Sequence, residues 1–272
     1  MSRALSLVVA SACFFGLVGA GLLAPDHLSA GSMEVAYKGP AEVFPFGTDA
    51  RGRPLTEYAQ QGARVIVLPA LVAGAAVAFA AVLGGLLRCV GSARVDSVIQ
   101  AFSELVGSLP RMVVILVVAL LIPSTWRSLL PLGLAWAVLG SPGAMDEAAA
   151  VAERLGGARF VEALKAHGFS WSRIYLYHIV ALNLRPVVVR QASETIVQVT
   201  FLEISLSYLS AQKNQSSFTH PDNIQSWAAL LADGYRSLVT SQPSGHALVL
   251  GLVLVGLVTL MARGFTVAAR AR

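Results

Sequence analysis

The segment RFVEALKAHGFSWSRIYLYHI, residues 159–179, decides how the rest of the chain is interpreted. It is basic and amphipathic, although it lies between two long apolar runs. Phe160, Val161 and Leu164 recur at the i,i+3 and i,i+4 spacings that place side chains on one helical face. Charged residues surround that face. We therefore expect a short helix that presents an apolar surface.

Glycines bound this short helix on both sides. An Ala-rich helix expected over 146–157 ends at Gly156 and Gly157, and Gly168 caps the amphipathic helix because glycine accepts the left-handed conformation of a helix terminus. Ser170 then N-caps a third helix that continues into the next apolar span. A rigid helix with an apolar face predicts a groove on a partner. The equally weighted alternative is that this face folds back on the chain's own helices or lies on the lipid interface.

The chain has the composition of an integral membrane protein. Of its 272 residues, 56% are hydrophobic and only 13% are charged, and the mean hydropathy is +0.68. The net charge of +5 does not indicate nucleic-acid binding, because the basic residues are scattered at the ends of apolar runs. The two cysteines, Cys13 and Cys89, lie in or beside such runs and are interpreted as unpaired packing residues.

Apolar stretches long enough to cross a hydrocarbon core of about 30 Å occur six times. The expected spans cover approximately residues 4–24, 65–87, 97–122, 128–145, 183–209 and 246–265. The expected fold class is therefore an all-α polytopic membrane protein with about six transmembrane helices. A cleaved signal peptide is the alternative for the first span, but its apolar stretch exceeds the usual length of roughly 7–15 residues.

The charges that flank the spans favour a topology with both termini in the cytoplasm, because Lys and Arg concentrate on that side of a membrane. Arg3, Arg88 and the basic residues of 154–190 are cytoplasmic in this arrangement. The expected parts are a first helix at 1–24, an outer loop at 25–63, a transmembrane core at 64–265 and a cytoplasmic tail at 266–272. Within the core, we expect 146–182 inside the cell and 210–245 outside.

Four motifs occur in chain order, namely FGTDARGR at 46–53 followed by GAR at 62–64, FVEALKAHG at 160–168, TFLEISLSYL at 200–209 and SWAALLADG at 226–234. They resemble motifs of permease subunits of ABC importers in the dipeptide, oligopeptide and nickel group. The second of them resembles the EAA loop of that family. Each motif is weak by itself, but four in the right order across six spans form a strong signal.

The sequence also departs from the family pattern. Leu164 replaces the second alanine of the EAA loop, Ala181 stands where the family usually has proline, and Pro54 stands where an aspartate usually follows Gly-Arg. These departures predict a divergent branch with a specialised substrate or with an ATPase groove adapted to leucine.

The resemblance implies a type I ABC-importer permease fold, in which the inner loop is a coupling helix that docks in a cleft of a cytoplasmic ATPase. The ATPase-coupling residues that it implies are Arg159, Phe160, Val161, Glu162, Ala163, Leu164 and Gly168. The implied partners are a second homologous permease, two ATP-binding subunits, an extracytoplasmic substrate-binding protein and the lipid of the plasma (inner) membrane. Short peptides are the implied substrate, with nickel complexes and other small ligands as alternatives.

Ionisable residues inside the expected spans are candidates for the translocation path, because charges in a bilayer are costly and often functional. They are Glu104, Arg111, Glu194 and Glu203. Glu104 and Arg111 lie two turns apart on nearly the same face of the third expected span, which allows them to pair, and Pro110 is expected to kink the helix between them. Glu104 and Glu203 match acidic positions of the family, which favours a role in the architecture of the bundle. Arg111 and Glu194 are better candidates for a role specific to this protein.

The outer loops offer candidates for docking of an external binding protein. These are Asp49, Arg51, Arg53, Trp227 and Asp233. The loop at 210–245 is long enough to form a docking surface or a gate. For FGTDARGR, the equally weighted alternative is a turn in which Asp49 and Gly52 only fix the local backbone.

Enzymatic motifs are missing from the sequence, which has no G-x-x-x-x-G-K-[ST], H-E-x-x-H or G-x-S-x-G pattern and no Cys/His metal spacing. We therefore expect no catalytic residue, metal or cofactor in this chain, with ATP and Mg²⁺ bound by the partner ATPase. Two other classes stay open. A proton-coupled secondary transporter would use Glu104, Glu194 and Arg111 as a relay, and a non-transporting scaffold or sensor would bind the ATPase without accumulating substrate.

Overall fold

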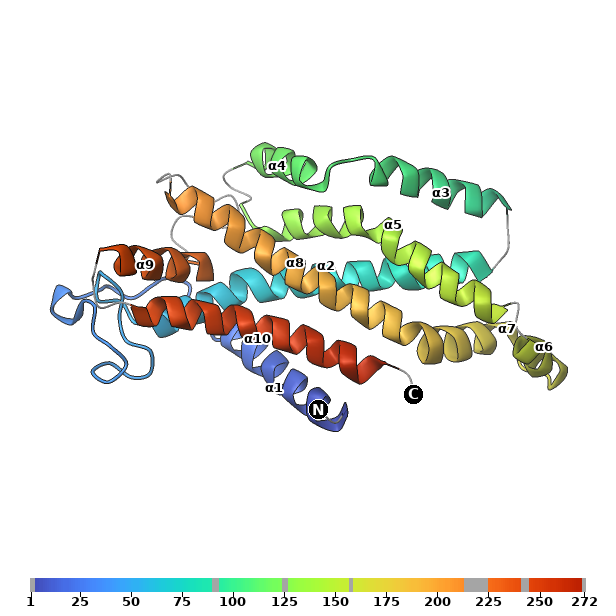
Figure 1. Cartoon of the computed structure of the whole chain (residues 1–272), viewed down its shortest axis with the longest axis horizontal. Coiled ribbons are helices and arrows are strands. Elements are labelled where there is room, and N and C mark those ends of the chain that lie inside the picture. Colours follow the sequence, from blue (N-terminus) through green and yellow to red (C-terminus); the bar gives the residue numbers. More distant parts are fainter. Residues whose placement is uncertain are drawn as a thin grey trace.

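A computed structural model describes residues 3–89, 93–123, 127–156, 159–212, 225–240 and 245–270. Those residues form an elongated helical bundle (Figure 1). A single isolated β-bridge, between Thr48 and Pro54, is recorded among them. The expectation of an all-α protein is therefore confirmed for the part of the chain that the structure describes.

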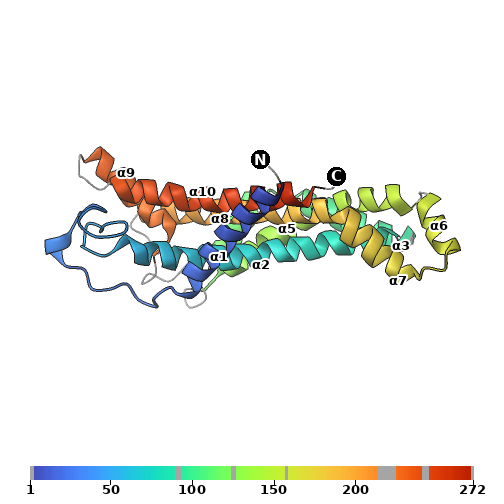
Figure 2. The same ribbon diagram turned by 90° about the horizontal axis from the view of Figure 1, so that it is seen from below.

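Five long helices run along the bundle (Figures 1 and 2). They are α1 (Arg3–Leu22), α2 (Leu55–Cys89), α5 (Leu129–Gly156), α8 (Arg185–Gln212) and α10 (Gly245–Ala269). Helix α2 contacts both α5 and α8, whereas α1 packs chiefly against α10 and α2. The 35 residues of α2 correspond to about 52 Å at a rise of about 1.5 Å per residue. This length exceeds a hydrocarbon core of about 30 Å.

Three described helices are long and apolar enough to cross a membrane, namely Ala4–Leu22, Leu55–Leu87 and Gly245–Ala269. The pair Ser97–Gly107 and Arg111–Leu121 would add a fourth span if it crosses the bilayer as one unit. Helices α5 and α8 have suitable lengths, but their ionisable side chains lower their hydropathy. The six-span topology therefore stays a prediction.

The expected third span at 97–122 is not one kinked helix. It is divided into α3 (Ala93–Gly107) and α4 (Arg111–Leu121), which are bent by 78° relative to each other. Pro110 is the N-cap of α4, and it lacks the N–H that would continue the hydrogen-bond ladder of α3. Proline at this position therefore separates the two helices completely.

Two helices extend beyond their expected spans. Helix α2 begins at Leu55, inside the segment that we expected as an outer loop. Helix α5 continues to Gly156, through residues expected in the cytoplasm, and Ala148, Ala149 and Ala152 of this extension are buried in the bundle. The helices are longer than the apolar stretches because polar residues also form helix when one face can pack.

Two apolar clusters form the core. The first joins α2, α5 and α8 and contains Ala70, Leu132 and Val199, while the second joins α1, α2, α9 and α10 and contains Trp227 and Met261. Many core positions are alanine, which lets the helices approach closely. The clusters hold the five long helices as one bundle.

The shorter elements other than α3 and α4 lie at opposite ends of the bundle. Helix α6 (Arg159–Ala166), α7 (Trp171–Arg173) and a π-helical segment (Ile174–Leu184) form one end. Helix α9 (Trp227–Val239) and the segment that contains the 3₁₀ helix Met33–Val35 form the other end. Both views show this separation (Figures 1 and 2). The expected outer loop at 210–245 contains α9, and its residues 213–224 and 241–244 lie outside the described residues.

Candidate functional site

Helix α6 ends in a Schellman motif. The N–H of Phe169 donates to the carbonyl of Leu164 at 3.1 Å, and the N–H of Gly168 donates to the carbonyl of Lys165 at 2.9 Å. Gly168 has φ +81°, a conformation that side chains with a Cβ rarely adopt. The prediction that Gly168 caps this helix is confirmed, and the end of the helix is therefore rigid.

The apolar face of α6 is only partly available to a partner. Val161 is 4% exposed, and Leu164 is half-buried, whereas Glu162 and Ala163 are exposed. The chain itself covers Val161, which agrees for this side chain with the alternative that the apolar face folds back on the chain's own helices. Arg159 and Phe160 belong to α6, but their side chains lie outside the described part of the structure.

Cation–aromatic contacts brace α6 against the chain that follows it. The Lys165 ammonium nitrogen lies 3.2 Å from the centroid of the Trp171 ring, and the Trp171 ring stacks on Tyr175 at 5.1 Å between centroids. The guanidinium carbon of Arg173 lies 4.9 Å from the centroid of Phe169. Contacts of this kind are attractive because the aromatic face is electronegative. Ser170 is the residue before α7, but its hydroxyl contacts Ser172 and makes no N-capping bond to the backbone.

A π-helical segment joins this braced region to α8. Its buried residues Ile174, Ile179 and Leu184 recur every five positions, which matches the i→i+5 bonding of a π-helix. The Asn183 side-chain amide donates to the carbonyl of His178 at 2.6 Å. The expected continuation from 170 into the fifth span is confirmed, although its π form was not foreseen. Helices α6 and α8 are therefore joined by continuous helical structure after a short turn.

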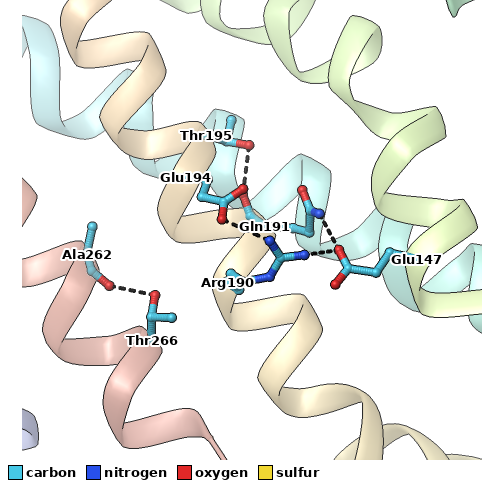
Figure 3. A network of polar contacts seen from close by, with 7 residues as sticks. All are labelled: Glu147, Arg190, Gln191, Glu194, Thr195, Ala262 and Thr266. Carbon is cyan, nitrogen blue, oxygen red and sulfur yellow. Dashed lines mark hydrogen bonds and ion pairs between the residues drawn. The ribbon is translucent and has the colours of Figure 1, made fainter. Parts of the chain in front are cut away.

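A polar network connects α8 to α5 (Figure 3). The Arg190 guanidinium pairs with the carboxylate of Glu147 on α5 and lies 3.1 Å from Glu194 Oε1, one turn along α8. The Gln191 amide also donates to Glu147 Oε2, at 2.5 Å. The side chains of Glu147, Arg190 and Glu194 are 33%, 38% and 48% exposed. The network therefore joins two helices and still faces outward from the chain.

The remaining polar candidates occupy different environments. Glu203 is fully buried and accepts a hydrogen bond from Ser207 at 2.7 Å, which agrees with an architectural role. Glu104 is exposed on α3 and accepts from Gln100 at 3.1 Å. Arg111 begins α4, beyond the break at Pro110. The shared helical face that we expected for Glu104 and Arg111 therefore does not exist.

The exposed face of α8 carries both polar and apolar side chains. Glu194, Gln198 and Ser205 are exposed on this face, together with the apolar Phe201 and Leu209. The Gln198 side-chain oxygen accepts from the indole N–H of Trp136 on α5 at 2.9 Å. We call the three polar residues Glu194, Gln198 and Ser205 the α8 stripe.

Other helices expose apolar side chains instead. Helix α4 exposes Met112, Leu116 and Leu120, and α10 exposes Leu252 and Val253. Apolar faces of this kind suit lipid or a neighbouring membrane helix. The α8 stripe therefore differs in chemistry from these two surfaces.

Two expected docking residues are structural. Trp227 is fully buried, and its indole N–H donates to the carbonyl of Ala59 at 3.0 Å. Asp49 is 7% exposed, and its carboxylate accepts from the backbone N–H groups of Arg51 and Arg53 and from the Tyr58 hydroxyl. These bonds agree with the alternative that FGTDARGR is a structured turn. Arg51 and Asp233 are more accessible.

The two outer motifs meet at a cavity of about 210 Å³. Asp49 and Tyr58 line it from one side, and Asp233 and Arg236 of α9 line it from the other. Burial raises the pKa of the Asp233 carboxyl, although Arg236 lies 3.7 Å away. The structure therefore brings together two sequence motifs that lie more than 150 residues apart.

The sequence interpretation missed Glu147 as a site residue. Its signal was a carboxylate in the Ala-rich segment 146–157, which directly follows the fourth expected span. Arg190 lies in the fifth expected span, where a basic side chain needs a carboxylate partner. The identity of the two partners required the packing of α5 against α8.

Comparison with known proteins gives distant relatives, whereas no family model matches the chain. The chain is 28% identical, over 207 residues, to the Probable D,D-dipeptide transport system permease protein DdpC of Escherichia coli strain K12, which covers 75% of this chain and 64% of the relative. It is 30% identical over 199 residues to the Oligopeptide transport system permease protein OppC of the same strain, covering 72% and 61%. The corresponding OppC of Salmonella typhimurium is 29% identical with the same coverage.

The chain is thus distantly homologous to permease proteins of peptide transport systems. It spans about 61–64% of the length of these relatives. The family resemblance seen in the four motifs is confirmed by similarity that extends over nearly three quarters of the chain.

Proposed function

We propose that this chain, a distant homologue of peptide-transport permeases, is the membrane permease subunit of an ATP-driven peptide importer. It forms half of a translocation pathway and carries no catalytic residue of its own. The observation that carries the proposal is the homology to two peptide-transport permeases over 72–75% of this chain. The rigid helix α6, at the end of the bundle opposite α9, supplies a physical basis for coupling (Figure 1).

The proposed topology has six spans, with both termini and α6 in the cytoplasm and α9 outside. Long helices α5 and α8 serve as the fourth and fifth spans, and α3 with α4 serves as a broken third span. The position of α6 and α9 at opposite ends supports this arrangement. The proposed location is the inner membrane.

The proposed partners are a second permease of the same kind, two ATP-binding subunits and an external substrate-binding protein. ATP and Mg²⁺ are bound by the ATP-binding subunits. On the outer face, the accessible Arg51 and Asp233 are the proposed contacts for the binding protein, while Asp49 and Trp227 hold the surface in place. Short peptides are the proposed substrate.

Coupling requires that a movement of α6 reaches the membrane helices. The Schellman cap and the contact of Lys165 with Trp171 prevent α6 from moving independently of α7. The π-helical segment then passes the displacement to α8, and the pair Arg190–Glu147 passes it to α5. Rigid elements transmit such displacements better than flexible loops do.

The test is copurification of the ATP-binding subunits after mild solubilisation. Leu164→Asp places a charge on the half-buried apolar face of α6 and should reduce recovery of these subunits at least tenfold, because buried interface anchors contribute about 2 kcal/mol or more. Phe160→Asp should have the same effect. Membrane insertion of each variant is checked by its yield in the membrane fraction.

Leu238→Asp is the matched control, because Leu238 is an exposed leucine of α9 at the opposite end of the bundle. It should leave the recovery unchanged. Equal recovery with Leu164→Asp and wild type would contradict the role of α6. A proton-coupled transporter would accumulate substrate without any ATP-binding partner, and a scaffold would copurify with the ATPase but not transport.

A further inference from the structure

The α8 stripe combines three features that together point to contact with water. Its members Glu194, Gln198 and Ser205 are exposed, they lie on one face, and they are polar. Helix α8 packs against α10, which is a candidate span, so the stripe runs beside the membrane-crossing part of the bundle. A charged or polar surface of this kind is unfavourable against lipid and favourable against water.

The charges at one end of the stripe are unequal. Arg190 supplies one positive charge, whereas Glu147 and Glu194 supply two negative charges. Glu147 receives hydrogen bonds from both Arg190 and Gln191. Glu194 receives one from Arg190 at 3.1 Å, and it is the most exposed of the three side chains. A carboxylate can accept more hydrogen bonds than this, so Glu194 retains acceptor capacity toward the outside.

We propose that the α8 stripe lines a water-filled pathway and that Glu194 accepts a cationic group of the cargo, such as the protonated amino terminus of a peptide. This inference rests on the proposed function, because it assumes that the chain forms part of a pathway. The surplus carboxylate attracts cations into the pathway and repels anions. Gln198 and Ser205 then offer hydrogen bonds in place of water, and Phe201 offers an apolar contact between them.

The experiment measures the reaction of single cysteines with methanethiosulfonate reagents in membranes that contain the full chain. The background variant carries Cys13→Ser and Cys89→Ser, which removes both native thiols. Gln198→Cys and Ser205→Cys report on the stripe, and Val253→Cys reports on an exposed apolar position of α10. The cationic reagent carries a trimethylammonium group, and the anionic reagent carries a sulfonate group.

If the stripe is lined by water, Gln198→Cys and Ser205→Cys react at least tenfold faster than Val253→Cys. Gln198→Cys lies one turn from Glu194. At this position the cationic reagent should also react several-fold faster than the anionic reagent, after each rate is divided by the rate of the same reagent with a free thiol. Adding Glu194→Gln should bring this normalised ratio close to one without abolishing the reaction. The neutral amide has a similar size, so only the charge is removed.

Two results would overturn the inference. Reaction at the stripe no faster than at Val253→Cys would place the stripe against protein or lipid, and an unchanged charge ratio in the Glu194→Gln variant would remove Glu194 as the source of cation preference. Both results are independent of ATPase binding. Copurification of ATP-binding subunits with the same background variant therefore separates failure of this inference from failure of the proposed function.

Discussion

Arg190 links two helices through a single guanidinium group. It pairs with Glu147 on α5 and with Glu194 on its own helix. Its removal leaves Glu147 with the hydrogen bond from the Gln191 amide and takes away the positive charge between two carboxylates. The side chains of Glu147, Arg190 and Glu194 are between one third and one half exposed. The loss in the free energy of unfolding should therefore lie between that for a surface ion pair and that for a buried ion pair.

We expect Arg190→Gln to lower the free energy of unfolding by about 1 kcal/mol, which is typical of polar contacts between membrane helices. The measurement is the midpoint of thermal unfolding in detergent. Arg64→Gln is the control, because the Arg64–Asp26 pair is well exposed and should contribute little to stability. Equal shifts for the two variants would contradict a linking role for Arg190.

The spacing of Arg190 and Glu194 could be read from the sequence, since i,i+4 neighbours share a helical face. The contact with Glu147 could not, because it joins residues 43 positions apart and depends on how two helices pack. The same limit explains Val161 and Trp227. Their apolar character was evident, but the sequence did not reveal that the chain's own core covers them.

Helix α9 is held to α2 by a close contact between a glycine and a tryptophan. A Cβ atom at Gly62 would lie 2.2 Å from Cδ1 of Trp227, so this position has no room for a larger residue. The hydrogen bond from Trp227 to Ala59 and the bond from the Gln225 N–H to the Gln61 side chain fix the same junction. Motif residues 62–64 and 226–234 therefore meet in the fold.

At the scale of this helix pair, Gly62→Ala should lower the free energy of unfolding by about 1–3 kcal/mol, the usual cost of overpacking a core. The unfolding midpoint in detergent measures the effect. Gly140→Ala is the matched control, because a Cβ at this helical glycine meets nothing within 4 Å and should be neutral or slightly stabilising. A neutral Gly62→Ala would show that the junction can relax.

Helix positions were predicted better than helix ends. Hydropathy located α1, α2, α5, α8 and α10 approximately, because each contains an apolar stretch. It could not locate the start of α2 at Leu55, since TEYAQQGAR is polar but still packs one side as helix. It also treated 97–122 as one span kinked at Pro110, because neither hydropathy nor the proline itself reveals a bend as large as 78°.

At the scale of the whole molecule, the separation of α6 from α9 allows a direct test of the proposed topology. Ala163 of α6 and Leu238 of α9 are both exposed. In the background without native cysteines, Leu238→Cys should be blocked by a membrane-impermeant maleimide in intact cells, whereas Ala163→Cys should be blocked in inverted vesicles. The readout is the thiol that remains for a second label after denaturation. Blocking of both positions from one side would contradict opposite placement.

The sequence predicted the helical fold class and the family resemblance of the molecule, but not how its helices are linked and which faces they expose. The four motifs were sufficient for the family resemblance because they occur in the right order along the chain. The π form of the link was not predicted, and the exposure of the polar stripe depends on which side of α8 packs against the other helices.

The length of α5 sets the distance between α6 and the lipid. Its 28 residues correspond to about 42 Å, roughly 10 Å more than the thickness of a hydrocarbon core, and residues 146–156 extend toward α6, whereas the ends of α1 and α10 stop short of α6 in both views. In the proposed topology, the ATPase would bind a part of the bundle that protrudes beyond the lipid headgroups. A thicker or thinner bilayer would then change how much of this part is exposed, without changing its contact with the ATPase.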